Sequence, residues 1–275
     1  MDYFVSIEKG VAMKVSKKVL LLTAIMGMTW LGSFAMDGVA TKGASSISTE
    51  ETEYYGTASS EESDYSGTSS TEKVHQYGME VIDNAVERVY PSESIHTNYV
   101  PMIRWDLGGP DPLDRVTIYD GGDYYKYVTY GLTELYDKKS KDLKKNGFGM
   151  EFTFKLKKDA YKDEERELKN VVGILQTLAR STKEDGEIFK PYEYIYTGQT
   201  VGMDIERKSN IVGFITIPDR ELKPAYSAYG RADFIAFIGV TEQELQAVMK
   251  KELTVKELYE KLGTDVTSYT RKSVI

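Results

Sequence analysis

Carboxylate side chains are the groups in this sequence that could carry out chemistry. Asp111, Asp114, Glu134 and Glu151 lie in or beside a stretch with the pattern of a strand hairpin. Two such groups held close together can act as general acid and general base in hydrolysis. Each can equally be a turn or strand carboxylate that accepts bonds from backbone N–H groups or arginine. An extracytoplasmic hydrolase that uses Glu134 and Glu151 is therefore one hypothesis that the residues allow; the others are a protein-binding domain and a surface module that acts only as a spacer.

Other catalytic groups are scarce. The chain of 275 residues has no Cys and 2 His, which excludes disulfides, thiol nucleophiles, cysteine zinc sites and three-His metal sites. His75 and His96 fall in loop-like stretches rather than at strand ends, where a scaffold would hold a catalytic base. The sequence contains no phosphate-binding glycine loop, dinucleotide fingerprint, nucleophile elbow or His-Glu-x-x-His pair. We therefore expect neither a metal nor a cofactor.

The charge balance argues against a nucleic-acid partner. The chain has 35 Lys and Arg against 43 Asp and Glu, a formal net charge of -8. Nonspecific affinity for nucleic acid comes from clustered cations. One cationic run, residues 138–145, has five lysines and one aspartate but no aromatic residue for base stacking. It predicts a mobile, solvated loop.

An export signal is indicated by the first 35 residues. Three lysines precede an apolar run over residues 19–34, and Ser33 and Ala35 are the small residues expected before a cleavage site. A helix over this run would be about 24 Å long, short of the ~30 Å hydrocarbon layer. We expect cleavage after Ala35, with an uncleaved N-terminal membrane anchor as the alternative. The start codon is either Met1 or Met13.

These features predict four segments. The signal or anchor over residues 1–35 is followed by a Ser/Thr/Glu-rich stretch, residues 36–73, whose composition predicts a disordered tether. A folded domain over residues 74–263 and a C-terminal tail over residues 264–275 complete the chain. The domain is then extracellular or tethered to the outer side of the membrane, and cytoplasmic if the N-terminal segment is not a functional signal.

The spacing of apolar residues in the folded part predicts helices and strands without a regular alternation. Helical periods cover residues 74–89 and 168–179, and strand patterns cover residues 116–119, 125–130, 150–156, 211–217 and 234–240. In residues 150–156, apolar side chains alternate with Glu151, Thr153 and Lys155, which predicts one wet face. Two capping boxes, Thr241 with Glu244 and Thr254 with Glu257, predict helices near the end. We expect an α+β domain with a mixed, largely antiparallel sheet packed with helices.

Tyrosine is unusually frequent, with 21 Tyr against 9 Phe. Tyrosine pairs an apolar ring with a polar tip, so it is enriched on surfaces that are wet in one state and buried in another. Strand propensity would explain the same clusters. A partner-binding surface and a tyrosine-rich core therefore both remain open at this point.

Several segments resemble the suppressor-of-fused family. The resemblance begins with Trp-Asp-Leu-Gly-Gly-Pro-Asp-Pro-Leu-Asp at residues 105–114 and continues with Tyr-Val-Thr-Tyr-Gly-Leu-Thr-Glu-Leu-Tyr at 127–136. Gly-Phe-Gly-Met-Glu-Phe-Thr-Phe-Lys-Leu at 147–156, Leu-Gln-Thr-Leu-Ala-Arg at 175–180 and Phe-Ile-Gly-Val-Thr-Glu-Gln-Glu-Leu at 237–245 follow in the family's order. Together they cover roughly residues 100–262. Tyr125-Lys126 stands where members commonly have Trp-His, and the segment 190–194 lacks a common Gly-His pair, which favours binding over catalysis.

The resemblance implies a single suppressor-of-fused-like domain that engages another protein. Animal members sequester a transcription factor by clasping an extended segment of it. Members of the bacterial branch, which this chain resembles, look like immunity proteins that neutralise polymorphic toxins. The leading hypothesis is therefore a protein-binding, non-enzymatic domain, an immunity or antitoxin-like inhibitor, with no nucleic-acid partner and membrane contact only through an uncleaved N-terminal segment.

The resemblance also places candidate residues. Contact with the partner is expected from Tyr127, Tyr130, Glu134 and Asp137, in a groove that suits strand addition. A stiff loop at the rim of that groove is expected from residues with restricted or unusual backbone angles and from two aspartates that can accept backbone N–H groups. These loop-shaping residues are Gly108, Gly109, Pro110, Asp111, Pro112 and Asp114.

Overall fold

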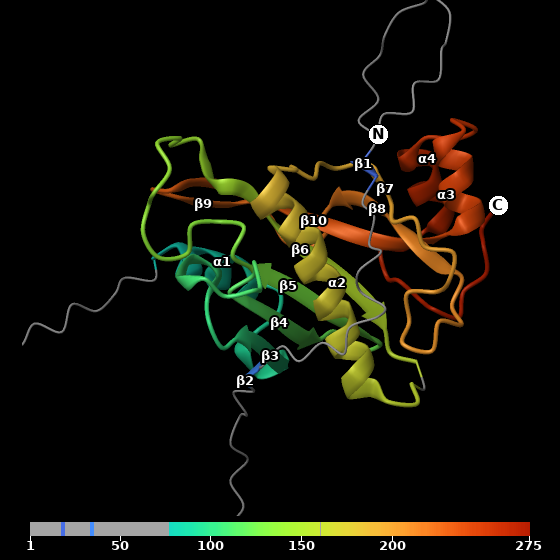
Figure 1. Cartoon of the computed structure of the whole chain (residues 1–275), viewed down its shortest axis with the longest axis horizontal. Helices are drawn as coiled ribbons and strands as arrows, with labels where there is room; N and C mark the ends of the chain where they lie inside the picture. Colours follow the sequence, from blue (N-terminus) through green and yellow to red (C-terminus); the bar gives the residue numbers. More distant parts are fainter. Residues whose placement is uncertain (1–17, 20–33, 36–76, 160) are drawn as a thin grey trace, which may run out of the picture.

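The computed structural model describes residues 18–19, 34–35, 77–159 and 161–275 of the chain (Figure 1). The predicted signal and tether over residues 1–73 therefore lie outside the described residues, except for two short strands, β1 (Lys18–Val19) and β2 (Phe34–Ala35). No helix among the described residues has the length and apolar character needed to cross a membrane.

Strands and helices are interleaved along the chain. The helices are α1 (Tyr77–Glu87), α2 (Glu164–Asp185), α3 (Glu242–Met249) and α4 (Val255–Leu262), with short 3₁₀ turns η1 (Ser92–Ser94) and η2 (Trp105–Leu107). The remaining strands are β3 (Ile95–Pro101), β4 (Arg115–Asp120), β5 (Tyr124–Tyr130), β6 (Lys145–Lys157), β7 (Tyr194–Tyr196), β8 (Ile211–Pro218), β9 (Ala225–Ser227) and β10 (Gly230–Thr241).

One mixed sheet organises the domain. Its strand order is β1-β7-β8-β10-β6-β5-β4-β3-β2, and β9 pairs with β10 outside this path. β10 runs parallel to β6 and β1 parallel to β7, whereas the other neighbours are antiparallel. The predicted α+β class with a mixed, largely antiparallel sheet is confirmed.

Helices cover both faces of the sheet. α2 lies across one face and packs its apolar stripe, including Leu168, Val172 and Leu175, against β5, β6 and β10 (Figure 1). On the other face, α1 packs against β5 and β9 through Ile82 and Val86. α3 and α4 cover β7, β8 and β10 in a separate cluster at the opposite end. The sheet is therefore buried on both sides over most of its area.

Burial on both sides corrects one expectation about β6. Glu151, Thr153 and Lys155 were expected to form its wet face, yet all three are buried. Thr153 and Lys155 face the gap between the α1 cluster and the α3–α4 cluster, where they contact Asp219 and Glu221, whereas Glu151 binds the chain reversal after β5. Segments distant in sequence close this gap. The alternation of apolar and polar side chains along β6 does not predict that these segments cover its polar face.

The C-terminal segment also belongs to the fold. Thr267 donates its N–H to the Lys155 carbonyl (2.8 Å) and accepts the N–H of Lys157 through its own carbonyl (2.9 Å). Arg271 pairs with the buried Glu244 at 2.6 Å. The predicted boundary at Gly263 is therefore too early, because residues 264–275 pack against β6, β10 and α3 rather than forming a separate tail.

Candidate functional site

Tyr127 and Tyr130 lie inside the core. Tyr127 packs on the α2 face, 6.0 Å from the Phe154 ring, and Tyr130 packs on the α1 face with the Arg115 guanidinium 3.8 Å from its ring centre. Both side chains are fully buried. The expectation that these rings line an open groove is wrong, because β5 has a helix on each side. They support the sheet from which the candidate site projects.

Glu134 organises the lysine-rich stretch that follows it. Its carboxylate accepts the Lys138 ammonium at 2.9 Å and the Lys139 N–H at 2.8 Å, and it also accepts the N–H of Ser140. Burial would raise the pKa of Glu134, but Lys138 and these N–H groups hold it below its ordinary value. Lys138 further donates to the Asp142 carbonyl at 2.7 Å. Residues 137–145, which we call the lysine loop, are thus held by internal hydrogen bonds.

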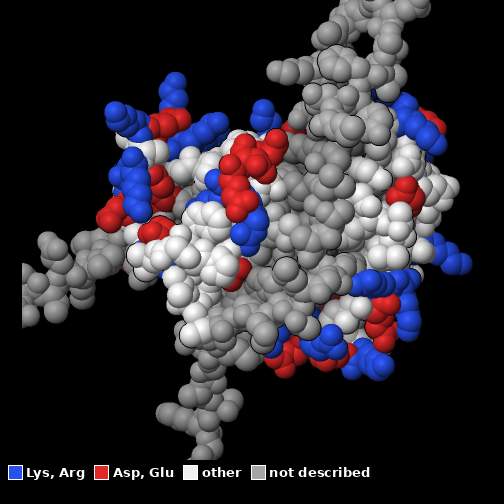
Figure 2. All heavy atoms as spheres, viewed as in Figure 1, with Lys and Arg blue, Asp and Glu red and all other residues white. Residues whose placement is uncertain are grey.

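The lysine loop forms a corner of the molecule beside β9 (Figure 1). That corner carries cationic side chains with acidic ones between them (Figure 2). Asp137 is exposed there, and so are Lys139, Lys141 and Lys144. Leu143, in the same loop, is 72% exposed. Of the four expected contact residues, Asp137 is the one whose side chain is exposed to solvent.

A second loop, residues 102–109, leads into the expected rim and includes its first two residues, Gly108 and Gly109. Gly109 donates its N–H to the Arg104 carbonyl at 2.9 Å, and a Cβ at this position would lie 1.9 Å from the Ile103 carbonyl oxygen. Gly108 has a φ of 89°, in the left-handed region that favours glycine. The two glycines therefore allow a tight turn that few other residues could form.

This turn presents apolar side chains to solvent. Met102, Ile103 and Leu107 are exposed by 70%, 54% and 69%. Asp106, between them, pairs with Arg104 at 2.9 Å and with Lys139 of the lysine loop at 3.5 Å. The ion pair between Asp106 and Lys139 joins the two loops. We call their combined outer face the two-loop surface; its apolar members are Met102, Ile103, Leu107 and Leu143.

The rest of the expected rim is largely internal. Pro112 is buried, and the Pro110 carbonyl accepts a bond from Arg180 at 2.5 Å. Asp111 is buried, and its Oδ1 has no hydrogen-bond partner among the described residues, contrary to the backbone bond expected. Burial raises the pKa values of Asp111 and Asp114, against the attraction of Arg180 and Lys183 respectively.

Glu151 is a structural carboxylate. Its Oε1 accepts the N–H groups of Gly131, Leu132 and Thr133 at 2.9 to 3.1 Å, and its Oε2 accepts the Thr129 hydroxyl at 2.8 Å. Burial raises its pKa against these bonds. The group fixes the reversal of the chain after β5. The carboxylates of Glu134 and Glu151 both accept hydrogen bonds from backbone N–H groups of nearby residues. Neither is therefore free to act as the acid or base of the hydrolase hypothesis.

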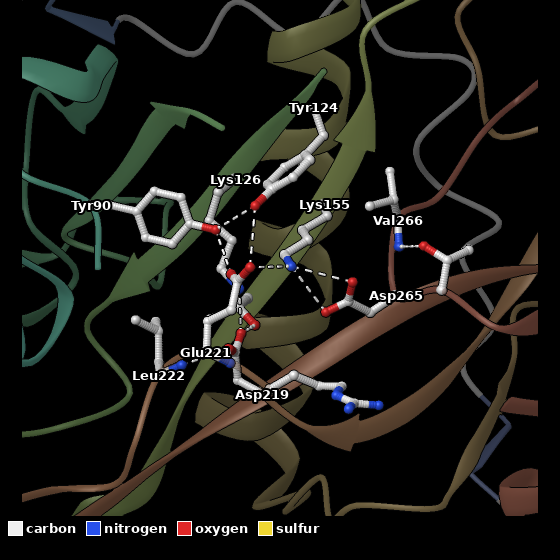
Figure 3. Close-up of polar contacts among 12 residues, drawn as sticks. Tyr90, Tyr124, Lys126, Lys155, Asp219, Glu221, Leu222, Asp265 and Val266 are labelled. Atoms are coloured by element: carbon white, nitrogen blue, oxygen red, sulfur yellow. Dashed lines mark hydrogen bonds and ion pairs between the residues drawn. The ribbon is translucent and has the colours of Figure 1, made fainter. Parts of the chain in front are cut away.

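A buried charge network fills the gap between the two helix clusters (Figure 3). The Lys126 ammonium from β5 pairs with Asp219, and Glu221 Oε2 lies 3.8 Å from the same nitrogen. Lys155 from β6 contacts Glu221 at 2.8 Å and Asp265 at 3.1 Å. These contacts connect β5 and β6 to the β8–β9 connection and the C-terminal segment.

Two tyrosines and backbone N–H groups complete the network. Tyr90 donates to Glu221, and Tyr124 donates to the other oxygen of the same carboxylate at 3.2 Å. Asp219 Oδ1 accepts the N–H groups of Glu221 and Leu222, each at 2.9 Å. Burial opposes ionisation of Asp219 and Glu221, but the lysines and these donors lower the pKa of both carboxyl groups. Each carboxylate pairs with a lysine, although two lysines face three carboxylates, and we interpret the network as structural.

A hollow opens beside this network. It has a volume of about 530 Å³ and lies between α1 and residues 221–226, with Asn84, Arg88, Glu221, Lys223 and Tyr226 among its lining residues. Its walls mix apolar and charged side chains. Among the described residues, no group of three or more His, Asp or Glu side chains could hold a metal ion.

The sequence contains one signal for the network. Lys126 and Lys155 each stand within an apolar strand, and a lysine is almost never fully buried unless it is paired. Their partners Asp219 and Asp265 are 93 and 110 residues away, so the sequence does not identify them. For the two-loop surface, the Gly108-Gly109 pair indicates a tight turn, but not the exposure of its neighbours.

Comparisons with known proteins agree on one family. A model described as suppressor of fused protein (SUFU) matches residues 109–272. The suppressor of fused homologs of Homo sapiens and Mus musculus are each 24% identical over 186 residues, which cover 63% of this chain but 37% of the relative. The chain thus spans well under two thirds of the length of these curated relatives.

Solved structures show the same fold. A crystal structure of a Sufu–Fu complex has a TM-score of 0.59 at 21% identity and covers 72% of this chain and 92% of that chain. The crystal structure of Drosophila Suppressor of Fused has a TM-score of 0.57 at 23% identity and covers 72% of this chain and 51% of that chain. At these identities, the likeness concerns the fold.

Proposed function

Because this chain belongs to the suppressor-of-fused family, we propose that it is a protein-binding domain that sequesters a partner protein without covalent chemistry. The observation that carries the proposal is the two-loop surface. Met102, Ile103, Leu107 and Leu143 remain largely exposed on loops whose backbones are held by hydrogen bonds. Apolar side chains that are fixed and exposed together commonly mark an interaction site.

The Sufu–Fu complex supports the same function, since in that complex a protein with this fold is bound to another protein. We further propose that the partner is a toxin and that this domain is an immunity or antitoxin-like inhibitor. Both ideas rest on the resemblance to bacterial members. The N-terminal sequence pattern supports export, with the domain acting outside the membrane or tethered to it. Sequencing the N-terminus of the mature protein tests export, and a first residue of Met36 would agree with cleavage after Ala35.

Binding can be tested with the full chain and the protein encoded by the neighbouring gene, using titration calorimetry. We expect a complex, and we expect Ile103→Ser to weaken it about tenfold, the effect of removing one well-buried interface anchor. Val201→Ser, at another partly exposed apolar position, is the matched control and should bind like the wild type. A complex that forms equally well with Ile103→Ser would remove the two-loop surface from the site. Absence of any complex would contradict the proposed partner.

A further inference from the structure

The lysine loop carries lysine side chains that have no ion-pair partner among the described residues. Lys138 forms an ion pair with Glu134, and Lys139 forms one with Asp106. Lys141, Lys144 and Lys145 are exposed, and none forms an ion pair with another described residue. They flank Leu143 in a protein whose formal net charge is -8. The loop is therefore a cationic region on an acidic molecule, placed directly beside exposed apolar side chains.

From this combination, we infer that the two-loop surface binds an acidic, amphipathic segment of the partner protein. Apolar side chains of that segment would cover Leu107 and Leu143, and its carboxylates would meet Lys141, Lys144 and Lys145. The inference rests on the proposed protein-binding function and names the class of partner that the site accepts.

Charge complementarity selects this partner class. An acidic segment is repelled by a molecule of net negative charge, except where cations are concentrated, so electrostatic steering would direct it to the lysine loop. The apolar side chains then supply affinity, because removal of apolar surface from water is favourable. A basic or neutral segment would gain the apolar contacts but not the steering.

The hydrogen bonds that hold both loops favour binding of a defined protein segment. Glu134 holds the lysine loop through three of its backbone and side-chain donors, and the glycine turn holds the apolar loop. Less conformational entropy is lost when both loops are fixed before binding. Because Asp106, Asp137 and Asp142 stand among the lysines, the site favours a segment whose carboxylates are spaced to meet single lysines over the uniformly charged surface of an anionic membrane.

Selection from a displayed library of random peptides tests the inference. The peptides would be about 12 residues long, which spans ~40 Å when extended. With the full chain as target, we expect enriched sequences in which Asp or Glu alternate with Leu, Ile, Val or Phe. Binding of the consensus peptide should weaken with rising salt, because the exposed lysines are screened.

Paired variants then locate the peptide. Lys141→Glu/Lys144→Glu and, separately, Leu107→Ser should each weaken the consensus peptide about tenfold. Lys250→Glu/Lys256→Glu makes the same charge change at two exposed lysines elsewhere, and Val201→Ser is the control for the apolar change. Both controls should bind like the wild type. Since all substituted side chains are exposed, folding should be unaffected, which circular dichroism can check.

The outcomes separate the inference from the proposed function. The inference would be overturned by basic or neutral consensus peptides, or by acidic peptides that bind Lys141→Glu/Lys144→Glu and Leu107→Ser as tightly as the wild type. Either result would leave the proposed protein binding intact. Failure to bind any peptide or the neighbouring gene product would contradict both. Vesicles containing phosphatidylglycerol form a further arm: binding to them that is lost in Lys141→Glu/Lys144→Glu would identify a membrane site instead and overturn the inference.

Discussion

Lys126 is a single residue whose environment determines its role. Its side chain is fully buried, and its ammonium group is neutralised by Asp219, which is also buried. A buried ion pair is not necessarily stabilising relative to apolar residues, but removing one partner leaves an uncompensated charge. Lys126 therefore contributes packing and charge compensation to the sheet of this chain.

Lys126→Met should therefore lower the free energy of unfolding by about 3 to 5 kcal/mol, measured by urea titration of the full chain. Lys157→Met, at an exposed lysine of the neighbouring strand, should change it by less than about 0.5 kcal/mol. In Lys126→Met/Asp219→Asn, the buried charge is gone and the amide oxygen can still accept the N–H groups of Glu221 and Leu222. The double variant should recover part of the loss. A single variant as stable as the wild type would show that the pair is not buried in solution.

At the scale of elements, two helical glycines with opposite surroundings make a matched test. A Cβ on Gly78 of α1 would lie 1.9 Å from the Glu134 carbonyl oxygen, whereas a Cβ on Gly173 of α2 would meet nothing within 4 Å. Helix propensity favours alanine over glycine by ~1 kcal/mol in a helix interior, as at Gly173, and by less at Gly78, the second residue of α1. At Gly78, the overlap with backbone should outweigh this gain, because α1 would have to move away from the segment that begins the lysine loop.

We expect Gly78→Ala to destabilise the full chain by about 1 to 3 kcal/mol and Gly173→Ala to stabilise it by about 0.5 to 1 kcal/mol. The midpoints of urea unfolding measure both. Similar effects of the two variants would mean that helix propensity alone governs them and that α1 does not dock as closely as the structure shows.

Local signals explain which elements could be predicted. The α1 stripe, the β4–β5 hairpin and both capping boxes depend on neighbours within a few positions, and the structure contains each of them. The burial of Tyr127, Tyr130 and the polar face of β6 depends on which helix covers which face. Side-chain alternation identifies two faces but not what covers them. The two-loop surface was missed for the same reason, since exposure of Leu107 and Leu143 is decided by distant segments.

At the scale of the whole molecule, carboxylates with lowered pKa values connect its parts. Asp219 and Glu221 connect the β8–β9 connection to β5 and β6, and Glu244 connects α3 to Arg271 of the C-terminal segment. Burial would raise the pKa of Glu244, but Arg271 and backbone N–H groups lower it. For such groups, the unfolded chain binds protons more readily than the folded chain does. Their contribution to stability is present above the ordinary values of 3.8 for Asp and 4.5 for Glu, and it is lost as the pH falls through the folded values.

The free energy of unfolding of the full chain should therefore fall steeply below about pH 4, by up to roughly 1.4 kcal/mol per pH unit for each proton taken up on unfolding. Asp219→Asn removes one of the groups that take up these protons. The gap between the free energies of unfolding of this variant and of the wild type should therefore narrow as the pH falls from 5 to 3. Asp123→Asn, at an exposed carboxylate, is the control. Urea unfolding at successive pH values measures the gap. If it stayed constant across this range, Asp219 would titrate alike in both states, and its pairing with Lys126 would not hold the sheet to the β8–β9 connection.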